Sequence, residues 1–278
     1  MSQQKLEHYP TIRQALGLVC LWFFLSLLVG EFLKMHFSAA LRWHASELGG
    51  FVLVVGISFR RANARFSEVY PLSPVNGRIL TGVVLTAVGV NIIISDLGNS
   101  ARAFLPSHFG ILPLLPPVVE GEEDLWRRLW RLALCSPVIE EFLFRGLILR
   151  GFLLNYSKKT AIILSALIFG FIHLHLSVAQ VVVGVGLGVL YGIWYVRTGS
   201  LVPGLVGHAL QNGLISIAKL LPFKISGYST GGPPAVQFQP WWFDLLGLIL
   251  VMVGFWVFLR ATHQSCVRSL PDQGSVSG

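Results

Sequence analysis

The sequence has little charge for its length. Asp, Glu, Lys and Arg together make up 12% of the 278 residues, about half of the roughly 25% found in an ordinary soluble domain. Apolar residues make up 54%, the mean hydropathy is +0.68, and the apolar residues fall in long runs. A helix of about 20 apolar residues crosses the hydrocarbon core of a bilayer. The composition therefore excludes a typical soluble domain and predicts an integral membrane protein.

Cysteine is also scarce. Cys20, Cys135 and Cys266 are the three cysteines of the chain, too few and too scattered for a disulfide framework or a zinc ribbon. The first apolar run has no small-residue cleavage site after it and is interpreted as a first span, not as a signal peptide. The net charge of +8 is explained by basic loops at an anionic membrane face, so we expect no nucleic-acid partner.

The apolar runs predict an all-α, polytopic membrane helix bundle with about eight transmembrane helices. The expected spans are residues 15–33, 46–59, 79–97, 130–153, 160–176, 178–196, 200–221 and 242–259. The fifth and sixth spans require a tight turn between them. We divide the chain into N-terminal helices with a Pro-rich and acidic loop, a helical core that carries the polar motifs, and a loop with the last helix and a polar tail. These are residues 1–125, 126–221 and 222–278.

Basic residues predict the orientation of the bundle. With eight spans both termini face the same side, and the loops on that side carry more Lys and Arg than the opposite loops, although the cluster Arg127–Arg131 opposes this bias. We therefore expect both termini in the cytoplasm, with the protein in the plasma (inner) membrane. The segment Ser100–Asp124, rich in Pro and acidic residues, is expected to lead to an interfacial amphipathic helix anchored by Trp126 and Trp130.

The predicted span 130–153 contains ionisable residues, which are costly inside a membrane and therefore indicate function. Glu141 and Arg145 are four residues apart on one helix face, so they can form an ion pair that serves packing or chemistry. Glu140 lies about 100° further round the helix. It is expected to have no partner in its own helix, which favours a chemical role.

Two other spans carry polar side chains one helical turn apart. Phe169 and His173 share a face of the fifth span, and His208 and Asn212 share a face of the seventh. An imidazole beside a carboxamide can bind a metal, a water molecule or a developing oxyanion. A plain interhelical hydrogen bond is the alternative. Together with Glu140, these side chains are the parts of a hydrolytic site.

The sixth span carries Gly184, Gly188 and Gly192 at four-residue spacing. Small residues on one face let two helix backbones approach closely in a membrane. We therefore expect this stripe to be a helix-packing surface.

The polar residues resemble, in order, three motifs of one family: Glu140-Glu141-x-x-x-Arg145, Phe169-x-x-x-His173 and His208-x-x-x-Asn212. This is the CAAX-protease and bacteriocin-processing family (CPBP, or Abi). It includes CAAX prenyl endopeptidases of the Ras-converting type and bacterial bacteriocin-processing or immunity proteins. The resemblance covers about Ser136–Ala218.

The resemblance implies a role for each matched residue. Glu140 would be the general base that activates water, helped by His173. His208 and Asn212 would stabilise the oxyanion that forms at the scissile carbonyl. The residues in supporting roles would be Glu141, Arg145 and Phe169.

The family is commonly labelled metalloprotease, and the residues leave metal dependence open. A zinc ion with an open position for water would use Glu140, His173 and His208. The sequence has no His-Glu-x-x-His pair, however, and Asn is a poor zinc ligand. We prefer a metal-free glutamate mechanism with no required cofactor and keep a divalent metal such as zinc as the alternative.

The leading hypothesis is an intramembrane endopeptidase that acts on a membrane-associated or lipidated peptide or protein. A prenylated CAAX sequence is one substrate class, and peptide processing or bacteriocin self-immunity is another. The expected partners are membrane lipids and such a substrate. One rival is a non-catalytic membrane scaffold or immunity protein of the same fold. Another is a transporter in which Glu140 and His173 relay protons, disfavoured because no inverted repeat is visible.

Overall fold

A computed structural model describes residues 9–33, 39–62, 64–104, 125–218, 225–228 and 237–268, and in these ranges all regular structure is helical. The helices, in chain order, are α2 (Ile12–Leu33), α3 (Ala39–Ala62), α4 (Phe66–Val69), α5 (Gly77–Phe104), α6 (Leu125–Leu129), α7 (Ser136–Glu141), α8 (Arg150–Asn155), α9 (Lys158–Phe171), α10 (Val178–Thr198), α11 (Val202–Ile217) and α12 (Trp241–Arg268). Helices α6, α7 and α8 are parts of one continuous helix, residues 125–155, called the motif helix below. The predicted all-α class is confirmed.

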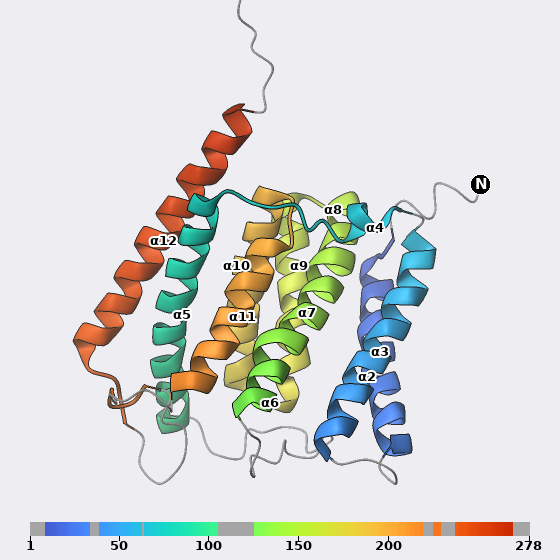
Figure 1. The fold of residues 1–278 in the computed structure, drawn as a ribbon, viewed down its shortest axis with the longest axis horizontal. Helices are drawn as coiled ribbons and strands as arrows, with labels where there is room; N and C mark the ends of the chain where they lie inside the picture. Colours follow the sequence, from blue (N-terminus) through green and yellow to red (C-terminus); the bar gives the residue numbers. More distant parts are fainter. Residues whose placement is uncertain are drawn as a thin grey trace, which may run out of the picture.

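The long helices stand side by side and alternate in direction along the chain (Figure 1). Helices α2 and α3 pack together at one end of the row, and α5 and α12 pack together at the other. The motif helix, α9, α10 and α11 form the middle. The start of α2 and the end of α12 lie at the same end of the bundle (Figure 1).

Four helices are long and apolar enough to cross a membrane: Ile12–Leu33, Gly77–Ala101, Val178–Thr198 and Trp241–Gln264. They carry large apolar side chains on their outer faces, such as Phe24 of α2 and Trp256 of α12. In a bilayer these faces contact lipid, and we conclude that the chain is an integral membrane protein. The other four predicted spans also fall on helices, namely α3, the motif helix, α9 and α11. Their passage through the membrane stays a prediction.

The loop before the motif helix differs from its sequence-based interpretation. Most of the segment Ser100–Asp124, with its acidic run, lies outside the described residues. Trp126 and Trp130 do not form a separate interfacial helix, since they occupy the first turns of the motif helix without a break. Both side chains are more than half exposed, which suits residues that contact lipid or its headgroups.

Local capping explains the tight turn that was predicted between the fifth and sixth spans. After α9 the chain makes one 3₁₀ turn over Ile172–His175. Ser177 then caps α10, because its side chain accepts a hydrogen bond from the backbone N–H of Gln180 at 3.2 Å. At its other end, α10 stops at Gly199, whose φ of 62° is left-handed and suits glycine.

The glycine stripe of α10 is a helix-packing surface, as predicted. A Cβ on Gly184 would lie 3.0 Å from the Cα of Gly170, and a Cβ on Gly188 would lie 2.8 Å from the Cα of Ala166. The backbones of α9 and α10 therefore touch along this face. Such contacts bring the two helices close enough for side chains from both to meet in the middle of the bundle.

We predict that Gly188→Ala destabilises the protein by about 1–3 kcal/mol, the usual cost of overpacking. The added methyl would press on the backbone of α9, which has no flexible side chain to move away. The control is Gly186→Ala in the same helix, because a Cβ there meets nothing within 4 Å. Thermal unfolding in detergent should show a lower midpoint for the first variant alone, and equal midpoints would contradict the prediction.

The segment between α3 and α5 covers the end of the bundle where the motif helix finishes. Arg150 Nε donates to the carbonyl of Glu68 at 3.0 Å, and Ser200 Oγ donates to the carbonyl of Ser73 at 2.8 Å. Beneath this cover every residue of Leu143–Leu149 is buried. The motif helix is thus enclosed toward α8, while its α6 end carries exposed side chains.

Candidate active site

The winding of the motif helix changes along its length. The backbone is π-helical over Trp130–Cys135 and again over Phe142–Leu149. π-Helical turns are rare and often occur at functional sites, and they rotate the following side chains away from the positions of a regular α-helix. Glu140 and Glu141 end α7, between these two stretches, and both are buried.

Glu141 and Arg145 form a buried ion pair, as their spacing predicted. Arg145 Nη1 donates to Glu141 Oε1 at 2.9 Å, and both side chains are 1% exposed or less. The guanidinium carbon lies 4.5 Å from the ring centroid of Phe169 and 5.1 Å from that of Tyr191. Arg145 Nη2 also donates to the carbonyl of Gly188 at 3.4 Å. Arg145 therefore joins the motif helix to α9 and α10.

His208 of α11 lies between the two glutamates. Its Nδ1 is 3.0 Å from Glu141 Oε1, and its Nε2 is 3.8 Å from Glu140 Oε2. An ionised carboxylate only accepts hydrogen bonds, so the contact with Glu141 places a proton on Nδ1 and directs Nε2 toward Glu140. Because Arg145 holds Glu141, the cluster fixes both the tautomer and the direction of His208.

Glu140 has a partner in its own helix, so that sequence-based expectation was wrong. Ser136, one turn earlier on the same face, donates its hydroxyl to Glu140 Oε1 at 2.5 Å. The other oxygen, Oε2, is buried without a hydrogen bond in the described part of the chain, and it faces His208 Nε2. One oxygen of Glu140 is therefore held in place while the other is free to accept a proton.

Phe169 lies beside both predicted histidines. Its ring centroid is 5.1 Å from that of His173 and 6.0 Å from that of His208. His173 Nδ1 donates to the carbonyl of Phe169 at 2.9 Å, since a carbonyl oxygen only accepts. The other ring nitrogen of His173, Nε2, is left for other contacts. In the part of the chain that the structure describes, no hydrogen bond or ion pair joins His173 to Glu140. Its assistance to Glu140 stays a prediction.

Asn212 contacts the backbone of the motif helix. In the π-helical stretch the N–H of Ser136 reaches back to the carbonyl of Arg131. The next donor in this pattern would be Pro137, which has no N–H, so the carbonyl of Leu132 is left without that partner. Asn212 Nδ2 donates to it at 2.9 Å. The proline thus creates an acceptor that the third motif fills, and one amide hydrogen of Asn212 remains for other contacts.

Two further residues at the site were missed in the sequence. Tyr191 of α10 is fully buried, and its ring centroid is 5.1 Å from that of His208. An aromatic residue in an apolar helix gives no signal that separates it from ordinary packing. Glu47 of α3 lies close enough to Glu140 for their charges to interact. A lone carboxylate inside the predicted span 46–59 was the signal for it.

The structure does not gather the three predicted metal ligands into one cluster among the described residues. Among the described residues no three His, Cys, Asp or Glu side chains gather closely enough to bind a metal ion. His208 Nδ1 is occupied by Glu141, which leaves Nε2, 3.8 Å from Glu140 Oε2, as the one nitrogen of His208 without a hydrogen bond to another described residue. His173 directs its Nδ1 to the backbone. The arrangement offers a carboxylate and one imidazole nitrogen, which suits proton transfer.

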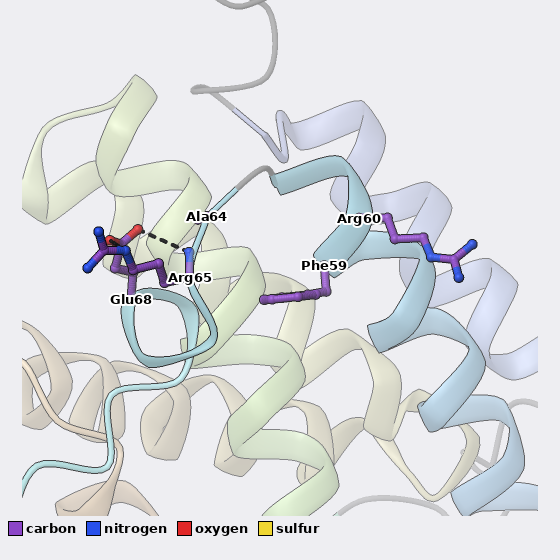
Figure 2. Close-up of a pocket in the computed structure, with 5 residues that line it drawn as sticks. All are labelled: Phe59, Arg60, Ala64, Arg65 and Glu68. Carbon is purple, nitrogen blue, oxygen red and sulfur yellow. Dashed lines mark hydrogen bonds and ion pairs between the residues drawn. The ribbon is translucent and has the colours of Figure 1, made fainter.

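A surface cavity of about 510 Å³ lies elsewhere, where α3 meets α4 (Figure 2). Its lining residues are Phe59, Arg60, Ala64, Arg65 and Glu68. Glu68 Oε2 accepts a hydrogen bond from the backbone N–H of Arg65 at 3.2 Å, and Arg60 points away from this pair (Figure 2). None of these residues belongs to the three motifs, so the cavity is separate from the cluster around Glu140.

The bundle and its buried cluster define a membrane protein with a polar site in its interior. Residues 122–214 match the model of a family described as type II CAAX prenyl endopeptidase Rce1-like. This part of the chain therefore is a domain of that family, the CPBP family, and it contains all three motifs. The resemblance is thus confirmed. No curated protein and no solved structure matches the chain significantly. Membership implies a peptidase with a protein or peptide substrate.

Proposed function

We propose that the protein is an intramembrane endopeptidase in which Glu140 activates water for attack on a peptide carbonyl. The carboxylate of Glu140 carries the proposal. Ser136 holds one of its oxygens at 2.5 Å, and the other is buried, unpartnered among the described residues and turned toward His208. A general base needs this combination of fixed position and a free lone pair.

The proton balance of the reaction follows from this geometry. Glu140 Oε2 accepts a proton from water while the water oxygen bonds to the carbonyl carbon. The carbonyl oxygen becomes an oxyanion, and we assign its stabilisation to the second amide hydrogen of Asn212 and to His208, which donates from Nε2 once that nitrogen also carries a proton. As the C–N bond breaks, the proton passes from Glu140 to the departing amine nitrogen. The carboxylate is thereby restored.

The proposed substrate is a membrane-associated or lipidated peptide, with a prenylated CAAX sequence as the first choice. The description of the matched family supports this choice. The depth of the site supports it as well, because Glu140 lies near the middle of a helix whose α8 end is enclosed. A peptide attached to a lipid would reach such a site from the bilayer more readily than a soluble peptide would.

Cleavage of a quenched fluorogenic peptide ending in a farnesylated CAAX sequence tests the proposal. The matched control is the same peptide without the farnesyl group, with the protein purified in detergent. Cleavage of the farnesylated peptide alone supports both the reaction and the substrate class. Cleavage of both supports a peptidase without prenyl selectivity. If monodisperse protein cleaves neither, the prenyl-CAAX proposal is wrong and the scaffold or immunity hypothesis is favoured.

We predict that chelators leave this activity within about twofold of the untreated rate. The reason is that the described cluster offers no set of three metal ligands, while general-base catalysis by a carboxylate needs none. Activity is measured after dialysis against EDTA and against 1,10-phenanthroline. Loss of activity that zinc restores would instead establish a metalloprotease.

We further propose that all eight helical segments span the membrane, with both termini in the cytoplasm. The alternating directions of the helices support this topology, and so do the basic loops at the end of the bundle that holds both termini. Labelling of a cysteine placed in the C-terminal tail by an impermeant maleimide, in intact cells and in lysed cells, separates the two orientations. Labelling in intact cells would place the C-terminal tail outside the cell and contradict the proposed orientation.

A further inference from the structure

Asn91 is a buried polar residue in an apolar helix outside the matched family domain. It belongs to α5 and is 2% exposed. Its Nδ2 donates to the backbone carbonyl of Gln211 at 3.0 Å, and its Oδ1 accepts from the Tyr228 hydroxyl at 2.7 Å. A carboxamide inside a membrane helix is costly unless it is bonded. Asn91 therefore links three separate parts of the chain: α5, α11 and the segment before α12.

The position of Gln211 gives this link its importance. Gln211 lies between His208 and Asn212 in α11 and precedes the latter directly. On another face of α11, Asn212 bonds to the carbonyl of Leu132 at 2.9 Å. Helix α11 is thus held on two faces, by α5 and by the motif helix, at the level of the two motif residues.

We propose that Asn91 is a positioning residue of the peptidase site, which fixes the rotation of α11 about its axis so that His208 and Asn212 face the motif helix. The inference rests on the proposed function. Asn91 contacts neither Glu140 nor His208 and acts through the backbone of α11. A displacement of about 1 Å in a catalytic group can lower a rate about 100-fold, so a small rotation of α11 is enough to impair catalysis.

The chain contains a matched control in Asn99. This residue has the same side chain, lies in the same helix and is 1% exposed. Its Nδ2 donates to the carbonyl of Gly227 at 2.8 Å and to Asp96 Oδ1 at 3.1 Å. Asn99 therefore holds the segment before α12, as Asn91 does through Tyr228, and these two bonds stay within α5 and that segment. A general loss of stability would affect both variants alike.

The first experiment compares Asn91→Leu with Asn99→Leu in peptide cleavage. We expect Asn91→Leu to lower kcat about 10- to 100-fold with KM within about twofold, and Asn99→Leu to keep kcat within about threefold. Asn91→Ser is the second variant, since it keeps a polar group too short to reach Gln211. Equal kcat values for the Asn91 and Asn99 variants would overturn the inference.

The second experiment measures the register of α11 without any activity. A Cβ on Gly213 would lie 3.5 Å from the Cβ of Ala133, a separation that suits a disulfide. Ala133→Cys with Gly213→Cys, in a background lacking the three native cysteines, should form this disulfide rapidly under mild oxidation. We expect Asn91→Leu to slow cross-linking about fivefold or more and Asn99→Leu to leave its rate unchanged.

The two readouts separate the inference from the proposed function. If the wild type cleaves no peptide while Asn91→Leu alone slows cross-linking, the peptidase proposal fails and the fixing of α11 by Asn91 stands. If the wild type cleaves peptide but both asparagine variants behave alike in cross-linking and in kcat, the peptidase proposal stands. The role of Asn91 is then wrong.

Discussion

Glu140→Gln should lower kcat for peptide cleavage by about 10²–10⁴-fold, the usual contribution of a general base. Glutamine keeps the size of the side chain and can still accept the Ser136 hydroxyl, which lies 2.5 Å from Glu140 Oε1. What it loses is the carboxylate that takes a proton from water. The fold should therefore survive, with thermal midpoints close to that of the wild type, and KM should change little.

Two further variants sharpen this experiment. Glu31→Gln changes an exposed carboxylate near the end of α2 and should leave cleavage unchanged. Ser136→Ala frees Glu140 Oε1 without removing the base and should lower kcat by less than Glu140→Gln does. Cleavage at the wild-type rate by Glu140→Gln would rule out the glutamate mechanism, whatever the substrate.

Arg145→Met should destabilise the protein by about 3–5 kcal/mol, the cost of leaving a buried charge without its partner. Glu141 is fully buried and bonds Arg145 at 2.9 Å, so its carboxylate would remain in the bundle with only His208 beside it. The guanidinium also lies over two aromatic rings. Methionine would keep part of that packing and none of the charge. Unfolding by heat or denaturant in detergent measures the loss.

The double variant Glu141→Gln with Arg145→Met tests the electrostatic cause. Replacing both charges removes the unpaired carboxylate, so we expect the double variant to be more stable than Arg145→Met alone. Arg197→Met, at an exposed site near the end of α10, is the control and should change stability by less than about 1 kcal/mol. A double variant less stable than Arg145→Met alone would show that packing, not charge, dominates at this site.

The sequence predicted the helices well because the spans are long apolar runs separated by segments that contain charged residues. All eight expected segments fall on helices, and the four-residue spacing of Glu141 and Arg145 correctly predicted their ion pair. Such periodicity assigns a residue to a face of its own helix. It also could have found Ser136, which lies one turn before Glu140, had hydroxyl groups been considered along with charges.

Contacts between helices could not be predicted in the same way, because a pattern along one helix does not name the helix that packs against it. The meeting of His208 with both glutamates depends on where α11 crosses the motif helix. The bond from Asn91 to Gln211 depends on α5, which lies some 120 residues earlier in the chain. The π-helical turns have no recognisable sequence pattern, although Pro137 explains why the carbonyl of Leu132 is open to Asn212.

The pairing of α5 with α12 has a consequence for the order in which the chain folds during synthesis. A Cβ on Gly82 would lie 2.6 Å from the backbone N of Phe258, so the two helices touch along their backbones. Helix α5 is made well before α12, and N-terminal parts fold first as a chain is made. The face of α5 that carries Gly82 therefore stays open to lipid until α12 has been made. A chain that ends before Trp241 would contain every motif residue and still lack the partner of the helix that positions α11.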